Sequence, residues 1–76
     1  MAFDNDRNRV LRSLRDKPEG VDHASLIEVL GLSNEMVERH LLYCVDYGLA
    51  YWTRTRTSKL AVITPRGRDY LGRQGI

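Results

Sequence analysis

The order of apolar and polar positions along the chain predicts three helices, a β-hairpin and a short final helix. In the first segment, from about residue 4 to residue 16, apolar residues recur at helical spacing and arginines fill much of the remaining surface. Pro18 and Gly20 follow and end this helix. The apolar positions that we expect to face the core are Phe3, Val10, Leu11 and Leu14.

The second helix has a clear start signal. Asp22 is a good N-cap residue, Ser25 falls at the third helical position, and Val21 can pack on Leu26 as a hydrophobic staple. Gly31 supplies the left-handed residue that closes the helix. The apolar face of this helix consists of Leu26, Ile27 and Leu30.

A third helix begins almost at once. Ser33 is its N-cap, Leu32 can form a staple with Val37, and Gly48 marks its end. Because only residues 31–33 join it to the preceding helix, the two helices must cross sharply. This is the helix-turn-helix pattern, in which the second helix, here residues 33–48, is placed to enter a groove. Its expected inward stripe is Val37, Leu41, Cys44 and Val45.

The pattern then changes to one typical of strands. Residues 49–55 and 59–64 are rich in β-branched and aromatic residues, and residues 56–58 form a short connection between them. We therefore expect a two-stranded hairpin, although its connection lacks the Asn-Gly or Gly-Gly pair of the tightest turns.

A short helix follows the hairpin. Thr64 is its N-cap, Pro65 occupies its first position, and it runs to about Arg73. Tyr70 and Leu71 are expected to face the core. The 76 residues are enough for one domain, residues 1–76, and no more.

Composition excludes several classes of protein. With 42% apolar and 29% charged residues, the chain is typical of a globular domain rather than a disordered one. A chain this short has little room for a catalytic cleft, and it shows no nucleophile–base pair or phosphate loop, so we expect no enzyme and no cofactor. Cys44 lies in an apolar helical pattern and is expected to be buried, and His23 and His40 have no neighbours at ligand spacing, so no metal site is expected.

Nothing in the sequence resembles a membrane or export signal. No apolar run approaches the roughly 18 residues that span a bilayer. The first four residues lack the form of a signal peptide. We therefore expect a cytoplasmic protein with no membrane partner.

The net charge of +2 conceals a strong asymmetry. Residues 19–49 hold six acidic residues and one arginine, whereas residues 50–76 hold six basic residues and one aspartate. The positive field is thus concentrated in the C-terminal third, as expected if that third faces an anion.

Two stretches resemble known regulators. Residues 33–50 are similar to the recognition helix of bacterial ArsR- and MarR-type regulators in their serine cap, their Arg39-His40-Leu41 step and their Tyr47-Gly48-Leu49-Ala50 ending. Residues 63–71, Ile-Thr-Pro-Arg-Gly-Arg-Asp-Tyr-Leu, resemble the segment that follows the wing in many such domains. The resemblance covers nearly the whole chain. It implies an α+β winged helix-turn-helix: a three-helix bundle with a C-terminal two-stranded wing and a short terminal helix.

The chain also departs from those families. It lacks the cysteine, histidine and carboxylate clusters with which ArsR-type proteins sense metals, and the extra helices with which MarR-type proteins dimerise and bind ligands. Glu35 and Glu38 stand where small or neutral polar residues are usual. We therefore expect the reading head alone.

The resemblance implies a double-stranded DNA interface with two parts. Helix 33–48 would enter the major groove, with Asn34 able to pair with adenine, Arg39 with guanine, and a glutamate with the cytosine amino group. The wing, residues 50–64, would lie on phosphates or in the minor groove. The full set of candidate contacts is Ser33, Asn34, Glu35, Glu38, Arg39, Arg54, Arg56, Lys59 and Arg66, with Leu42 at the margin.

The predicted function is sequence-specific DNA binding by a small transcriptional regulator, with a homodimer as one route to useful affinity. The alternative is an interaction module that docks a protein partner through its acidic third helix. The charge of that helix favours a protein, and the basic wing favours DNA.

Overall fold

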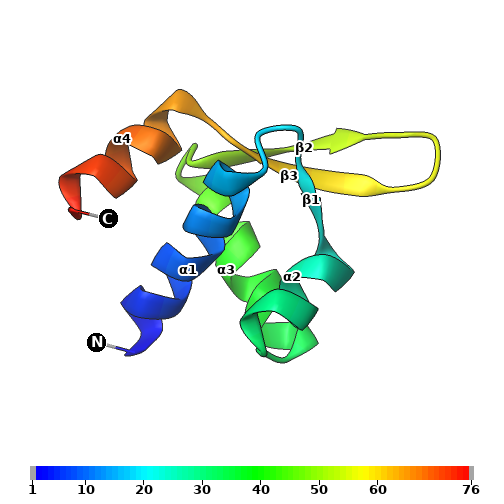
Figure 1. The fold of residues 1–76 in the computed structure, drawn as a ribbon, viewed down its shortest axis with the longest axis horizontal. Helices are drawn as coiled ribbons and strands as arrows, with labels where there is room; N and C mark the ends of the chain where they lie inside the picture. The colour runs from blue at the N-terminus through cyan, green and yellow to red at the C-terminus, as the bar shows by residue number, and fades with distance from the viewer. Residues whose placement is uncertain (1, 76) are drawn as a thin grey trace.

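The computed structural model describes the backbone of residues 2–75 and the side chains of residues 6–75, so the predicted core position of Phe3 lies outside the described side chains. The predicted α+β winged helix-turn-helix is confirmed (Figure 1). Helices α1, α2 and α3 gather on one side of a small sheet, and the hairpin projects beyond them. In chain order the elements are α1 (Ala2–Asp16), β1 (Val21–Asp22), α2 (His23–Leu30), α3 (Asn34–Asp46), β2 (Ala50–Arg54), β3 (Lys59–Ile63) and α4 (Pro65–Arg73).

The sheet has one strand more than predicted. Its order is β1-β3-β2, with both pairs antiparallel. Val21 pairs with Ala61 and Asp22 pairs with Leu60, so the residues predicted as staple and cap of α2 also form a strand. The predicted two-stranded hairpin is confirmed as β2 and β3. Strand β1 was not predicted, because a two-residue strand is too short to show any alternation of apolar and polar positions.

The predicted starts of α2, α3 and α4 are confirmed by their caps. Oδ1 of Asp22 accepts a hydrogen bond from the amide of Ser25 at 3.2 Å, and Oγ of Ser33 accepts one from the amide of Met36 at 3.2 Å. Thr64 caps α4 by accepting from the amide of Gly67 at 3.0 Å. Its hydroxyl also donates to the carbonyl of Gly48 at 2.6 Å, which ties the start of α4 to the end of α3.

The core lies between the helices and the inner face of the sheet. Most predicted apolar positions are buried in it, but Ile27, Val45 and Tyr70 are only half-buried. The fully buried histidine His40 also lies on the inner face of α3. Two polar residues of α1, Arg7 and Asn8, are also buried. The largest fully buried side chains are Val10, Leu11, Leu14, Leu26, Val37, His40, Leu41, Cys44 and Leu71.

The burial of Arg7 has a physical cause. Its guanidinium carbon lies 3.4 Å from the centre of the Tyr43 ring on α3, so the charge is stabilised by the aromatic face while the stem covers apolar surface. This contact joins α1 to the third helix and fixes one side of it.

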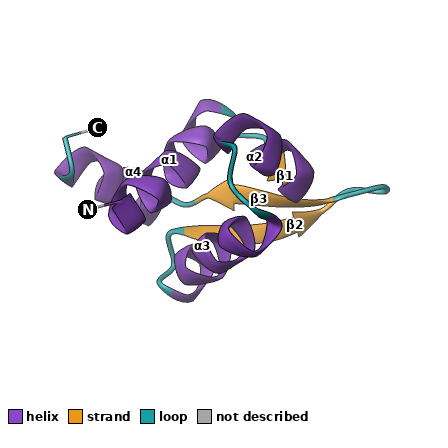
Figure 2. Ribbon diagram, turned by 90° about the horizontal axis from the view of Figure 1, so that it is seen from below, coloured by secondary structure: helices purple, strands orange, loops and turns teal. Residues whose placement is uncertain are grey.

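The hairpin and α4 extend to opposite ends of the molecule (Figures 1 and 2). The sheet runs between them, and α4 lies beside α1. None of the described helices is long and apolar enough to cross a membrane.

Candidate nucleic-acid interface

The turn between α2 and α3 is short and rigid. Gly31 has φ 68° and closes α2, and Ser33, in extended conformation, starts α3. Nη2 of Arg9 donates to the carbonyl of Leu30 at 2.8 Å, which holds the C-terminal end of α2 against α1. On the other side, Nε2 of His23 lies 3.3 Å from the carbonyl oxygen of Asn34, within hydrogen-bond reach. These two contacts hold α2 against α1 and against the start of α3, so the angle between α2 and α3 is fixed.

One face of α3 is free for a partner. Glu35, Glu38, Arg39 and Leu42 follow one another at i, i+3, i+4 and i+7, which places them on one side of a helix. All four are exposed, and Leu42 retains 49% of its surface. Asn34 is exposed in the first turn. Among the side chains that the structure describes, Arg39 forms no ion pair.

The opposite face of α3 is structural. Burial lowers the pKa of His40, and the neighbouring charge of Asp6 raises it while those of Arg7 and Arg39 lower it further. Burial also raises the pKa of the Cys44 thiol to about 12, so this cysteine stays protonated and unreactive at neutral pH. Within residues 6–75 no three metal-binding side chains gather in one place.

The tip of the hairpin is held by one threonine. Oγ1 of Thr55 accepts hydrogen bonds from the amides of Thr57 and Ser58, at 3.4 and 3.0 Å, and donates to the carbonyl of Ser58 at 3.2 Å. The amide of Thr55 donates to the same carbonyl at 2.8 Å. This ordered turn takes the place of the missing Asn-Gly pair.

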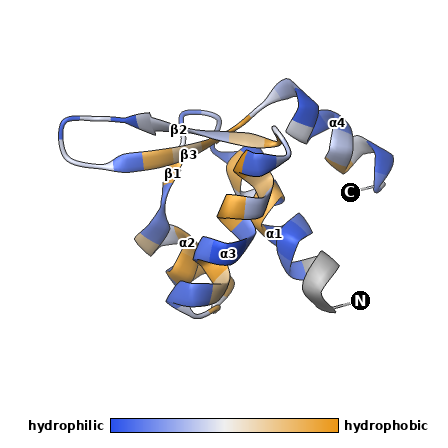
Figure 3. Ribbon diagram, turned by 180° about the vertical axis from the view of Figure 1, so that it is seen from behind, coloured by the Kyte–Doolittle hydropathy of each residue, from blue (hydrophilic) through white to orange (hydrophobic). Residues whose placement is uncertain are grey.

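The same tip concentrates positive charge. Arg54 stands directly opposite Lys59 in the register of β2 and β3, and Arg56 lies in the turn between them. All three are exposed, and residues 47–68 contain no acidic residue. Figure 3 shows the hydrophilic tip beyond the apolar inner part of the strands. Arg54 and Arg56 are two positions apart but do not share a strand face, because β2 ends at Arg54 and the strand alternation ends with it.

A groove joins the hairpin to the exposed face of α3. It is lined by Glu38 and Leu42 from α3, by Trp52 and Lys59 from the hairpin, and by His23 from the start of α2. Nζ of Lys59 lies 4.3 Å from the centre of the Trp52 ring, which holds this charge against the hairpin. The helix and the wing thus form one continuous surface.

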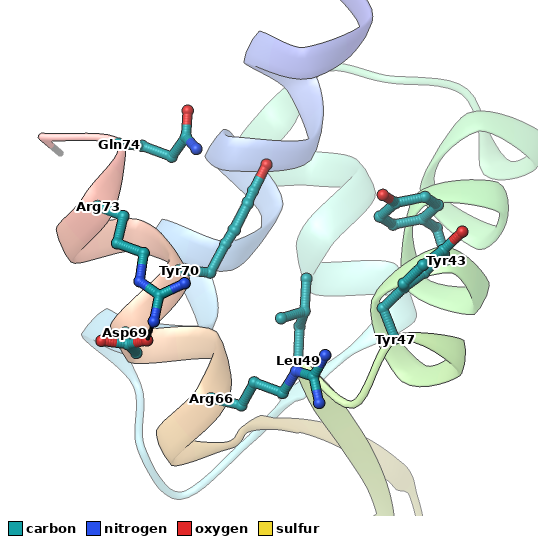
Figure 4. Close-up of a pocket in the computed structure, with 8 residues that line it drawn as sticks. All are labelled: Tyr43, Tyr47, Leu49, Arg66, Asp69, Tyr70, Arg73 and Gln74. Atoms are coloured by element: carbon teal, nitrogen blue, oxygen red, sulfur yellow. Dashed lines mark ion pairs between the residues drawn. The ribbon is translucent and has the colours of Figure 1, made fainter.

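Arg66 lies elsewhere. It lines a cleft of about 550 Å³ between the end of α3 and α4, together with Tyr43, Tyr47 and Tyr70 (Figure 4). The rings of Tyr43 and Tyr47 are stacked with their centres 4.3 Å apart. Because the length of β3, about 17 Å at 3.3 Å per residue, separates α4 from the tip, Arg66 does not join the cations of the wing.

The predicted residues therefore do not all belong to one surface. Seven of them are exposed on α3 and the hairpin: Asn34, Glu35, Glu38, Arg39, Arg54, Arg56 and Lys59. Ser33 is the N-cap of α3, and Arg66 lines the separate cleft between α3 and α4. Sequence reasoning missed the positions of His23 and Trp52. His23 could have been found from its position directly after the N-cap of α2. The beginning of that helix lies beside the beginning of α3, so a residue at this position is close to the exposed face of α3.

Comparison with known proteins supports the fold. No family model and no curated protein matches the sequence. Among solved structures, RV1404 from Mycobacterium tuberculosis is 29% identical, with a TM-score of 0.79 over 91% of this chain and 48% of that one. The PcaV transcriptional regulator from Streptomyces coelicolor is 24% identical, with a TM-score of 0.83 over 91% and 50%. MepR, a transcription regulator of a Staphylococcus aureus multidrug efflux pump, is 17% identical, with a TM-score of 0.83 over 91% and 53%.

These structures are winged-helix proteins of the MarR type, so the predicted resemblance is confirmed at the level of the fold. The chain spans about half the length of each protein that it matches.

Proposed function

We propose that this chain binds double-stranded DNA as the reading domain of a transcriptional regulator. The observation that carries the proposal is the concentration of positive charge at the tip of the hairpin. Arg54 stands opposite Lys59 in the register of the two strands, Arg56 lies in the turn between them, and residues 47–68 contain no acidic residue. The groove lined by Glu38, Leu42 and Lys59 connects this cationic tip to the exposed face of α3. The similar proteins PcaV and MepR are transcription regulators, which supports the same assignment.

Electrostatics favours an anionic partner for the wing. Like charges directly opposite each other in a hairpin destabilise it. A phosphate placed against Arg54 and Lys59 relieves that repulsion. The hydroxyls of Thr57 and Ser58 in the turn add donors of the kind that contact phosphate oxygens. The wing is therefore assigned to the backbone of the duplex.

The third helix is assigned to the major groove. An α-helix with its side chains is about 10–12 Å wide and the groove is about 12 Å wide, so the exposed face of α3 fits into it. Asn34 offers the amide that pairs with adenine, and Arg39, which no carboxylate neutralises among the described side chains, offers the fork that pairs with guanine. Ser33 keeps its capping role, because its Oγ accepts from the amide of Met36.

A salt titration tests the proposal. Each phosphate that the protein neutralises steepens the fall of log affinity with log salt concentration by about 0.9. Three phosphate contacts from the wing, together with the charge of Arg39 in the groove, predict a slope of about −4. The double variant Arg54→Ala, Arg56→Ala should flatten the slope by about two units while leaving the domain folded. Fluorescence anisotropy with a labelled random duplex at two or more salt concentrations measures it.

The matched control is Arg12→Ala, Arg73→Ala, which removes the same charge from exposed positions on α1 and α4. It should leave the slope close to that of the wild type. A wing variant that binds as the wild type does at every salt concentration rejects the assignment of the hairpin. If duplex binding is absent and only Glu35→Gln, Glu38→Gln weakens association with a protein, the acidic-helix alternative is correct.

A further inference from the structure

The exposed face of α3 contains one side chain that cannot form a hydrogen bond. Leu42 is 49% exposed and follows Glu38 by one helical turn on the same face. Both residues line the groove that faces the wing. A carboxylate can only accept hydrogen bonds, and an isobutyl group can only make apolar contacts. Each of these side chains therefore selects a narrow class of chemical group.

We propose that the site read by α3 contains a thymine whose methyl group packs on Leu42 and a cytosine whose amino group donates to Glu38. This inference rests on the proposed function and adds base identity to it. It concerns the bases that the protein prefers, not the phosphate contacts that hold it on the duplex.

The chemistry of the major groove supports these two partners. Only cytosine and adenine present amino donors there, and the adenine donor lies beside the acceptor N7, which repels a carboxylate. Thymine alone presents a methyl group. Lys59, which lines the same groove as Glu38, supplies a positive charge that offsets the repulsion between this carboxylate and nearby phosphates.

Helix geometry fixes the spacing of the two bases. Residues 38 and 42 are separated by about 6 Å along the helix axis, at 1.5 Å per residue. Base pairs follow at about 3.4 Å. The cytosine and the thymine should therefore lie one or two base pairs apart.

The first experiment tests Leu42. Selection from a random duplex pool, with the 76-residue chain at low salt, identifies a preferred sequence that is then remade with uracil for the thymine. Loss of the methyl group should weaken wild-type binding about fourfold, the effect of one buried methyl-sized group. Leu42→Ala should bind the thymine and uracil duplexes equally. Val29→Ala, at an exposed aliphatic position on α2, should keep the wild-type ratio.

The second experiment tests Glu38. The variant Glu38→Gln both donates and accepts hydrogen bonds, so it should change the preferred base from cytosine to adenine by about tenfold or more. Glu28→Gln, at an exposed carboxylate on α2, should retain cytosine. Repeated selection with each variant measures the preference.

The outcomes separate this inference from the proposed function. Salt-dependent duplex binding with no base preference, or with the same preference in Glu38→Gln and in Leu42→Ala as in the wild type, overturns the readout and leaves DNA binding standing. Absence of any duplex binding overturns both. A consensus with cytosine and thymine one or two base pairs apart, which changes as described in the two variants, supports the inference.

Discussion

At the scale of single residues, α4 contains two glycines in contrasting surroundings. A Cβ on Gly67 would overlap the carbonyl oxygen of Leu49 and the side chain of Ile63, whereas a Cβ on Gly72 would meet nothing within 4 Å. The first glycine allows α4 to pack against the chain where it leaves α3. The second only weakens the helix, since glycine is a poorer helix former than alanine.

The two alanine variants should therefore have opposite effects. Gly67→Ala should lower the free energy of unfolding by about 2 kcal/mol, the usual cost of overpacking. Gly72→Ala should raise it by about 0.5–1 kcal/mol. Urea unfolding of both variants measures this. Equal stabilities for the two would contradict the close approach of α4 to Leu49.

His40 should make stability depend on pH near neutrality. Burial lowers its pKa below the ordinary value of 6.5, and Asp6, Arg7 and Arg39 are the charged groups that act on it. The unfolded chain therefore binds a proton at a higher pH than the folded one. Stability from this source is present above pH 6.5 and is lost as pH falls from there towards the lowered pKa.

Thermal melts between pH 7.5 and pH 5.5 should show this loss. In His40→Gln, which has no titrating group at this position, the melting temperature should change less over the same range. Asp22 does not interfere, because the hydrogen bond from Ser25 lowers its pKa from 3.8 and its stabilising contribution is lost only as pH falls below that value. Identical pH profiles for wild type and variant would exclude His40 as the cause.

At the scale of elements, the proposed function sets stability against binding in the wing. Arg54 opposite Lys59 destabilises the free hairpin, and under the proposed function these two charges bind a phosphate. Arg54→Glu should convert this repulsion into a cross-strand ion pair, worth about 0.2–1 kcal/mol. The variant should therefore melt at or above the wild-type temperature while its duplex affinity falls steeply. Calorimetry measures the melting temperature and fluorescence anisotropy the duplex affinity, both on one preparation of the variant. A variant that loses stability without losing duplex affinity would contradict the role given to Arg54.

The elements differ in how far sequence could predict them. The caps at Asp22, Ser33 and Thr64 were readable because a cap depends on residues only three positions apart. Strand β1 was not, because its pairing partner Ala61 lies 40 positions away in the chain and two residues show no pattern. The burial of Arg7 likewise depends on Tyr43, which only the packing of α1 on α3 brings near.

The candidate site was likewise predictable only where it depends on residues that are close in sequence. The exposed residues of α3 and the cations of the hairpin follow from helical period and composition. That Lys59 and Glu38 share a groove does not, because it depends on how the wing folds back beside α3. Arg66 was assigned to the same surface from its position after the wing, but its helix lies at the opposite end of β3 from the tip.

At the scale of the whole molecule, charge and shape act together. Residues 19–49 hold six acidic residues and one basic residue, whereas residues 50–76 hold six basic residues and one acidic residue, so the net charge of +2 says little about the field at any one face. The cationic tip and the exposed face of α3 border one groove, whereas α4 lies at the other end of the molecule, beside α1. That arrangement leaves α1, α4 and the exposed rings of Tyr47 and Tyr51 available to a second copy.

A single copy should bind a duplex weakly, because one helix and one wing supply only about four phosphate contacts. Helix-turn-helix proteins reach useful affinity by placing two copies on half-sites about 10 base pairs apart. We therefore expect a homodimer, and we expect a duplex carrying two selected sites at that spacing to be bound far more tightly than one carrying a single site. Sedimentation at micromolar concentration, with titrations of duplexes spaced by 10 and by 15 base pairs, tests this. The 15-base-pair spacing places the sites on opposite faces of the duplex and should lose the gain. A strict monomer that binds one site tightly would show that the domain reads DNA without a partner copy.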